Sequence, residues 1–169
     1  FVAPILYLSV TSVDNPETKA VLPQTIAALD RWDGTATPDE AVFAALAADL
    51  KQANADKTAA LVGKRLNYEI SGMRSKVLSA SRMAAGLEVG PYREKFLEAD
   101  PVWAEPDTWA VIKRNGAGLT PYYLLTAVDL QQTPSGGLER VAPDQAVFMT
   151  ILGRTLLVAG MVMAFTLIL

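Results

Sequence analysis

The chain has no cysteine and no histidine among its 169 residues. The missing cysteines exclude disulfides and thiolate nucleophiles, and the two absences together exclude zinc sites of the cysteine and histidine type. The missing histidines also remove the usual general base at neutral pH. The sequence therefore singles out no catalytic, cofactor-binding or metal-binding residue.

Charge is scarce at both ends of the chain. Lys and Arg number 15 against 18 Asp and Glu, a net charge of -3 that gives no reason to expect a nucleic-acid partner. No charged residue precedes Asp14, and only Arg154 follows Asp144. A helix over residues 146–169 would span roughly 36 Å, enough to cross the hydrocarbon core of a bilayer.

The C-terminal apolar segment has large apolar side chains on every helical face, whereas a surface helix of a soluble protein keeps a polar side. We therefore interpret residues 145–169 as a membrane-spanning helix, truncated at its end, and not as a buried core helix. Residues 1–13 are uncharged but too short to span, and they lack the basic start and cleavage site of a signal peptide. We interpret them as the C-terminal end of a first transmembrane helix.

The polar segment 14–144 predicts a mainly α fold, because turn residues punctuate it regularly and alternating β-branched runs are few. Thr37, Pro38 and Glu40 predict a helix start in which Thr37 caps the helix and Glu40 reaches back to complete a capping box. The apolar residues behind it recur at helical spacing and predict one buried stripe: Val42, Phe43, Leu46, Leu50 and Ala53. Further helices are predicted over 22–31, 57–66, 73–85, 91–98, 107–113 and 121–130, and residues 138–142 as a short extended stretch.

Residues 64–82 are rich in Lys and Arg, with Glu69 as the one acidic residue among them. Such a stretch suits lipid headgroups or an acidic partner. Acidic residues follow directly between 88 and 107, so the two stretches could instead face each other or water. We favour the second interpretation because exposed charge is usually solvated surface.

Two tryptophans, Trp103 and Trp109, flank Glu105 and Asp107. Ring faces and carboxylates together can enclose an organic cation, which makes these four residues the candidates for a substrate-binding site. The tryptophans are six positions apart across a proline, so packing of both in the core is the alternative that we favour. Residues 115–118 contain two glycines but lack the Lys-Ser/Thr ending of a phosphate loop, and we interpret them as a turn.

Three residues are candidates for a membrane interface. Tyr122 and Tyr123 precede an apolar stretch, and both a position at the headgroup level and inward packing remain open. Arg154 lies one turn inside the apolar C-terminal segment, where a charge at the bilayer centre would be costly. We expect its side chain to reach toward the headgroups, with contact to a neighbouring subunit as the alternative.

Six segments resemble the permease subunits of binding-protein-dependent ABC importers, in particular the spermidine/putrescine type with a large loop after the first membrane helix. They are residues 3–17, 22–34, 66–75, 107–114, 120–130 and 151–169. The resemblance covers nearly the whole chain and consists of diffuse motifs, not of one diagnostic signature.

The resemblance implies a multi-pass protein of the bacterial inner membrane that conducts a small polar, polyamine-like solute. The chain would hold the end of one transmembrane helix, a helical periplasmic loop domain over 14–144, and most of a second transmembrane helix. Its implied partners are the lipid bilayer, a second permease subunit, an ATP-binding cassette subunit that hydrolyses ATP, and a periplasmic solute-binding protein. It would not itself be an enzyme, and its pore residues and ATPase-coupling loop would lie outside this chain.

Two other classes remain open. The sensor domain of a bacterial transmembrane receptor is also a helical domain between two membrane helices, and its second span should continue into a signalling coiled coil. A soluble enzyme with an apolar tail should show a pocket with convergent polar groups and shifted pKa values.

Overall fold

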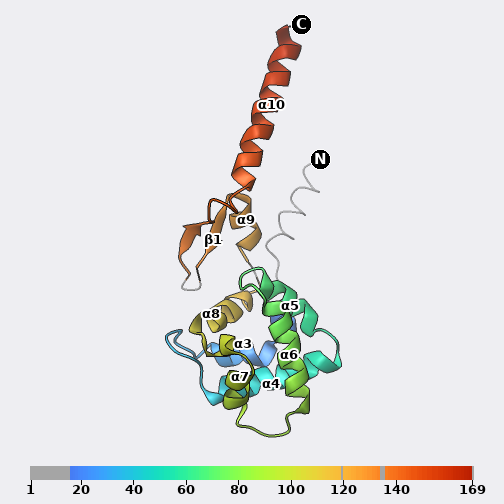
Figure 1. Cartoon of the computed structure of the whole chain (residues 1–169), viewed down its shortest axis with the longest axis vertical. Coiled ribbons are helices and arrows are strands. Elements are labelled where there is room, and N and C mark those ends of the chain that lie inside the picture. The colour runs from blue at the N-terminus through green and yellow to red at the C-terminus, as the bar shows by residue number, and fades with distance from the viewer. Residues whose placement is uncertain (1–15, 119, 134–135, 169) are drawn as a thin grey trace. The chain divides into compact units, whose positions relative to one another are not determined.

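The computed structural model describes residues 16–118, 120–133 and 136–168 (Figure 1). It confirms the predicted mainly α fold, because helices dominate and the described residues form only one sheet, of two strands. The predicted end of a first transmembrane helix at 1–13 lies outside the described residues.

The chain divides into two compact units, Asp14–Thr120 and a unit that contains Pro121–Leu169. The sequence predicted one polar domain over 14–144. In the structure, residues 121–144 group with the C-terminal helix. The elements of the first unit are α2 (Pro16–Val21), α3 (Pro23–Leu29), α4 (Glu40–Ala55), α5 (Ala59–Asn67), α6 (Met73–Gly86), α7 (Tyr92–Ala99), the 3-10 helix η1 (Pro101–Ala104) and α8 (Pro106–Asn115). Those of the second are α9 (Tyr122–Ala127), β1 (Leu130–Gln132), β2 (Leu138–Arg140) and α10 (Phe148–Ile168).

Helix α4 is the central element of the first unit and packs against α3, α6 and α7 (Figure 1). Its predicted apolar stripe is buried along its whole length. Leu46 and Leu50 are each 1% exposed, and Phe43 is fully buried. The helical spacing of these apolar residues thus predicted correctly which face of α4 lies in the core, because residues repeated with a period of 3.6 share one side of a helix.

The predicted capping box at the start of α4 is wrong. Asp39, not Thr37, is the N-cap, and its carboxylate accepts a hydrogen bond from the backbone N–H of Val42 at 3.2 Å. The Thr37 hydroxyl donates to the carbonyl of Ala104. The Glu40 carboxylate does not reach back along α4 but binds the start of α7. Thr37 and Glu40, which suggested the box, therefore make two separate contacts with other parts of the chain.

Helices α5 and α6 approach each other closely at Gly63. A Cβ atom at this position would lie 3.3 Å from the backbone of Arg74 and 3.4 Å from the Cβ of Val77. Glycine therefore lets the two helix backbones meet where a side chain would push them apart. Helix α6 begins after Gly72, which has a φ of 80° that favours glycine.

The second unit contains a hairpin between α9 and α10. Strands β1 and β2 pair antiparallel, with Leu130 opposite Arg140 and Gln132 opposite Leu138. Strand β2 covers the first three residues of the extended stretch predicted at 138–142, whereas β1 begins at the last residue of the helix predicted over 121–130. The reason is Asp129, whose φ of 54° is left-handed and interrupts the helix.

Candidate functional site

Helix α10 occupies Phe148–Ile168 within the segment predicted to span a membrane. Over Phe148–Leu167, 20 residues, it is long and apolar enough to cross a membrane, and none of its apolar window is buried within the structure. The large side chains point to all sides: Leu156, Val158 and Phe165 are 63%, 54% and 68% exposed. An apolar surface of this extent is unfavourable in water, at about 25 cal/mol for each Å².

A carboxylate caps the N-terminal end of α10. The two oxygens of Asp129 accept the backbone N–H groups of Phe148 at 3.0 Å and Met149 at 2.8 Å. The backbone carbonyl of Asp129 accepts the N–H of Val141 at 3.0 Å. A negative charge at this end suits the helix dipole, and Asp129 thereby ties the apolar helix to the hairpin before it.

The three predicted interface residues all lie in the second unit. Arg154 is exposed on α10, in the second turn of the helix. The rings of Tyr122 and Tyr123 meet edge to face, with centroids 5.2 Å apart. Tyr123 is 44% exposed, whereas Tyr122 is half-buried, so the structure separates the two tyrosines that the sequence left equivalent.

The structure brings Trp103 and Trp109 together, but inside the core of the first unit. Their ring centroids are 5.9 Å apart, and Trp109 donates its Nε1–H to the carbonyl of Trp103 at 2.9 Å. Both indoles are at most 1% exposed, while Glu105 and Asp107 are exposed. The four candidates therefore form no shared cation site, and the packing interpretation is the one that the geometry supports.

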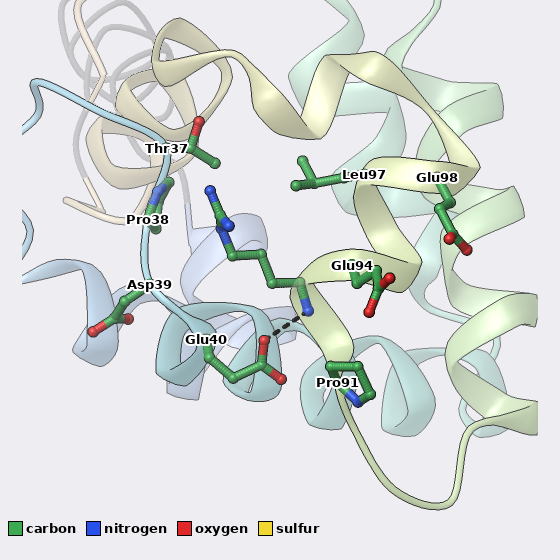
Figure 2. Close-up of a pocket in the computed structure, with 9 residues that line it drawn as sticks. Thr37, Pro38, Asp39, Glu40, Pro91, Glu94, Leu97 and Glu98 are labelled. Atoms are coloured by element: carbon green, nitrogen blue, oxygen red, sulfur yellow. Dashed lines mark hydrogen bonds between the residues drawn. The ribbon is translucent and has the colours of Figure 1, made fainter.

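An open groove of about 980 Å³ lies on the first unit between the start of α4 and helix α7 (Figure 2). Its lining comes from two segments more than fifty residues apart in the sequence. They are Thr37, Pro38, Asp39 and Glu40 on one side, and Pro91, Arg93, Glu94, Leu97 and Glu98 on the other. Figure 2 shows Leu97 pointing from α7 toward Thr37, with Glu94 and Glu98 extending on another side of the helix.

Glu40 holds the two sides of this groove together. Its carboxylate accepts the backbone N–H groups of Tyr92 at 2.6 Å and Arg93 at 2.9 Å. The dashed line at Glu40 in Figure 2 marks the second of these bonds. These N–H groups are donors of the first turn of α7, which have no partner within the helix. The carboxylate of a residue on α4 thus takes the place of an N-cap for α7, whose own N-cap residue, Pro91, supplies no side-chain hydrogen bond.

The groove carries four carboxylates and one guanidinium. Two of the carboxylates, Asp39 and Glu40, are committed to helix N-termini. Glu94 and Glu98, one turn apart on α7, are exposed, and no ion pair of the described residues involves them. The groove therefore offers a negative, partly apolar surface to a cationic partner. No three carboxylates of the described residues gather closely enough to hold a metal ion.

The basic stretch 64–82 is partly internal. The side chain of Arg65 is 2% exposed, lies 3.1 Å from Glu69 and donates to the Thr120 hydroxyl at 3.0 Å. Glu69 also accepts hydrogen bonds from Arg114 and Asn115. The one acidic residue of the stretch is thus the centre of a polar network that joins α5 to α8, which sequence spacing did not indicate.

Lys76 joins the basic stretch to the acidic one, as the favoured interpretation expects. Its Nζ atom lies 2.8 Å from Oδ1 of Asp100, which also accepts the backbone N–H of Val102 at 2.9 Å. Burial opposes ionisation of Asp100, but the hydrogen bonds from Lys76 and Val102 and the charge of Lys76 outweigh it and hold the pKa of this carboxyl below its usual value of 3.8.

Asp100→Asn is expected to lower the unfolding temperature at neutral pH but not in acid. Because the folded pKa lies below 3.8, the ionised carboxylate stabilises the fold above about pH 4 and loses this effect as the pH falls through the folded value. The measurement is the difference in Tm between the two proteins from neutral pH to about pH 2. Glu94→Gln, at an exposed carboxylate, serves as the control. A difference that persists unchanged in acid contradicts the role of the charge.

The chain matches no protein-family model, no curated protein and no solved structure. The apolar helix α10 and the groove are therefore the two features of the described residues that bear on function. The first was predicted from the distribution of charge. The second was missed, because its two sides come from segments that no local pattern connects.

Proposed function

We propose that this chain belongs to the permease subunit of a binding-protein-dependent ABC importer and forms part of the pathway for a small polar, polyamine-like solute. The observation that carries the proposal is helix α10, which is long enough to span and exposes apolar side chains on all sides. Lipid or neighbouring membrane helices are the surroundings in which such a surface is stable. The resemblance of segments along the chain to these permeases supports the same class.

In this proposal the first unit is periplasmic and the groove is where the solute-binding protein docks. Three features of the groove support docking of a protein: it is open, it has an apolar side at Leu97, and it carries an excess of carboxylates. A small ligand is usually bound in a pocket that buries most of its surface, whereas complementary charge guides the association of two proteins. A patch of Lys or Arg on the solute-binding protein is the matching surface.

The remaining parts of the transport machinery are assigned to partners. A second permease subunit completes the pathway, and an ATP-binding cassette subunit on the cytoplasmic side hydrolyses ATP. The chain itself is a multi-pass protein of the bacterial inner membrane and not an enzyme. The alternative function, an extracytoplasmic sensor domain of a receptor, places the same kind of domain outside the membrane but requires no transported solute.

Deletion of the gene in its source organism is expected to abolish the energy-dependent uptake of one class of small polar solute. The wild-type gene restores uptake, whereas Val158→Arg does not, because a charge in the middle of α10 costs about 2.5–3.5 kcal/mol on insertion. Val89→Arg is the matched control, since Val89 is 79% exposed in the first unit. Uptake is measured with radiolabelled solutes, polyamines first, and the variants are followed by membrane fractionation.

A deletion strain that accumulates all tested solutes normally but no longer responds to one of them supports the receptor and contradicts the permease. Recovery of the wild-type chain in the aqueous fraction without detergent contradicts both, because each places α10 in the bilayer.

A further inference from the structure

Helix α9 turns its apolar side outward. Tyr123, Leu124, Ala127 and the following Val128 share one side of the helix and are all exposed, Leu124 by 54% and Val128 by 47%. A helix that faces water carries polar residues at such positions. Its one hydroxyl apart from the tyrosines belongs to Thr126 and is used internally, donating to the carbonyl of Tyr122 at 2.8 Å.

This apolar stripe, Tyr123, Leu124, Ala127 and Val128, lies beside the start of α10. Asp129 follows the stripe directly and binds the N–H groups of the first two residues of α10. Helices α9 and α10 also contact each other. The first residues of α10, Phe148 and Met149, are themselves 49% and 48% exposed. The stripe is thus continuous with the apolar surface at the N-terminal end of the helix that we propose to span the membrane.

We infer that α9 lies in the interfacial region of the lipid bilayer, with the apolar stripe directed toward the acyl chains. The inference rests on the proposed membrane location of α10. Helices with one apolar face bind at this depth, and tyrosine suits it because its ring is apolar and its hydroxyl polar. The stripe covers a few hundred Å² at most, against about 800 Å² per partner in a stable protein interface, so lipid fits it better than a second protein.

Asp129 links the depth of α9 in the bilayer to that of α10. Because its carboxylate fixes the first turn of α10 to the residue that ends α9, a helix held at the headgroup level also sets the depth at which the span begins. Apolar spans alone leave depth and tilt to their flanking residues. In this protein the flanking device is a folded segment, α9 and the hairpin.

The absence of cysteine allows a direct test, since each single-cysteine variant carries one nitroxide label. The whole chain is reconstituted in phosphatidylcholine and phosphatidylglycerol vesicles, and collisions of the label with oxygen and with a water-soluble nickel chelate give its depth. Labels at Leu124→Cys and Val128→Cys are expected to lie roughly 5–10 Å below the headgroup boundary. A label at Val158→Cys lies deeper, and one at Glu139→Cys, in β2, remains in water.

Three results would differ from these expectations, and each leads to a different conclusion. A label at Val158 that is in water contradicts the proposed function and the inference with it. A label at Val158 in lipid together with labels at Leu124 and Val128 as accessible to nickel as that at Glu139 contradicts the inference alone. Labels at Leu124 and Val128 that are shielded from both oxygen and nickel show that protein covers the stripe, which also overturns the inference.

Discussion

Trp109→Ala is expected to remove a large part of the stability of the first unit. Trp109 is fully buried, its ring centroid lies 4.7 Å from that of Phe43, and its Nε1–H is bonded to the carbonyl of Trp103. Truncation of a buried tryptophan costs about 3–5 kcal/mol, against a typical total of about 5–15 kcal/mol. We expect the Tm to fall by about 15 °C or more, measured on the whole chain in detergent by the fluorescence of the remaining tryptophans.

A conservative variant at Trp109 and a matched control at Trp32 separate the contributions of the buried side chain. Trp109→Phe keeps an apolar ring but removes the hydrogen bond to Trp103, and it should cost about 1–2 kcal/mol. Trp32→Ala removes the same side chain where it is only half-buried, and it should cost less than Trp109→Ala. If Trp109→Ala left Tm unchanged but abolished the binding of an organic cation, the rejected cation site at these tryptophans would be the better interpretation.

The longer helices of the first unit could be predicted from the sequence because their signals are local. The predicted helix over 73–85 is observed as Met73–Gly86, that over 91–98 as Tyr92–Ala99, and that over 107–113 as Pro106–Asn115. Their apolar residues recur at helical spacing, and proline or glycine marks their starts. Side chains within one or two turns of each other determine such elements, so one segment contains the information.

Elements that depend on tertiary contacts or on a single residue were not predicted. Helix α2 and the 3-10 helix η1 are each a few residues long, and no periodic pattern can establish so short an element. Helix α9 ends three residues before the predicted bound because Asp129 is left-handed. Asparagine and aspartate adopt this conformation more readily than other side chains, but most aspartates do not, so the sequence alone favours neither outcome.

Long-range carboxylate caps are the main feature that the sequence did not reveal. Glu40 caps α7 across 52 residues, Asp49 caps α3 across 24, and Asp129 caps α10 across 19. A local pattern even suggested another partner for Glu40. Each acceptor meets its helix only after the chain has folded, which is why spacing rules for N-caps, built on neighbours three residues apart, cannot find it.

The two candidate functional features, helix α10 and the groove, differ in the same way. Helix α10 was predicted because the absence of charge over a long segment is visible in the sequence. The groove was not, because its two sides, residues 37–40 and helix α7, meet only in the folded chain, where the carboxylate of Glu40 binds the start of α7. A solvent-exposed carboxylate on an isolated helix looks the same whether it lines a docking surface or faces water.

Asp49→Ala is expected to destabilise the first unit by about 3 kcal/mol, because it leaves buried donors without an acceptor. Asp49 is 2% exposed and accepts the backbone N–H and the hydroxyl of Thr25, both at 2.7 Å. It also accepts the side-chain amide of Gln24 at 3.2 Å. The N-cap of α3, Leu22, has no side-chain acceptor to replace it. The measurement is the denaturant midpoint of the whole chain in detergent.

Asp39→Ala is the matched control, since Asp39 also caps a helix of the same unit but is exposed. Its loss should cost about 1 kcal/mol, the usual value for an N-cap that water can partly replace. Thr25→Val in the Asp49→Ala background removes the orphaned hydroxyl and should recover part of the lost stability, giving a coupling energy of about 1 kcal/mol or more. Equal losses for Asp49→Ala and Asp39→Ala, with no coupling to Thr25, would show that the buried carboxylate does not hold α3 against α4.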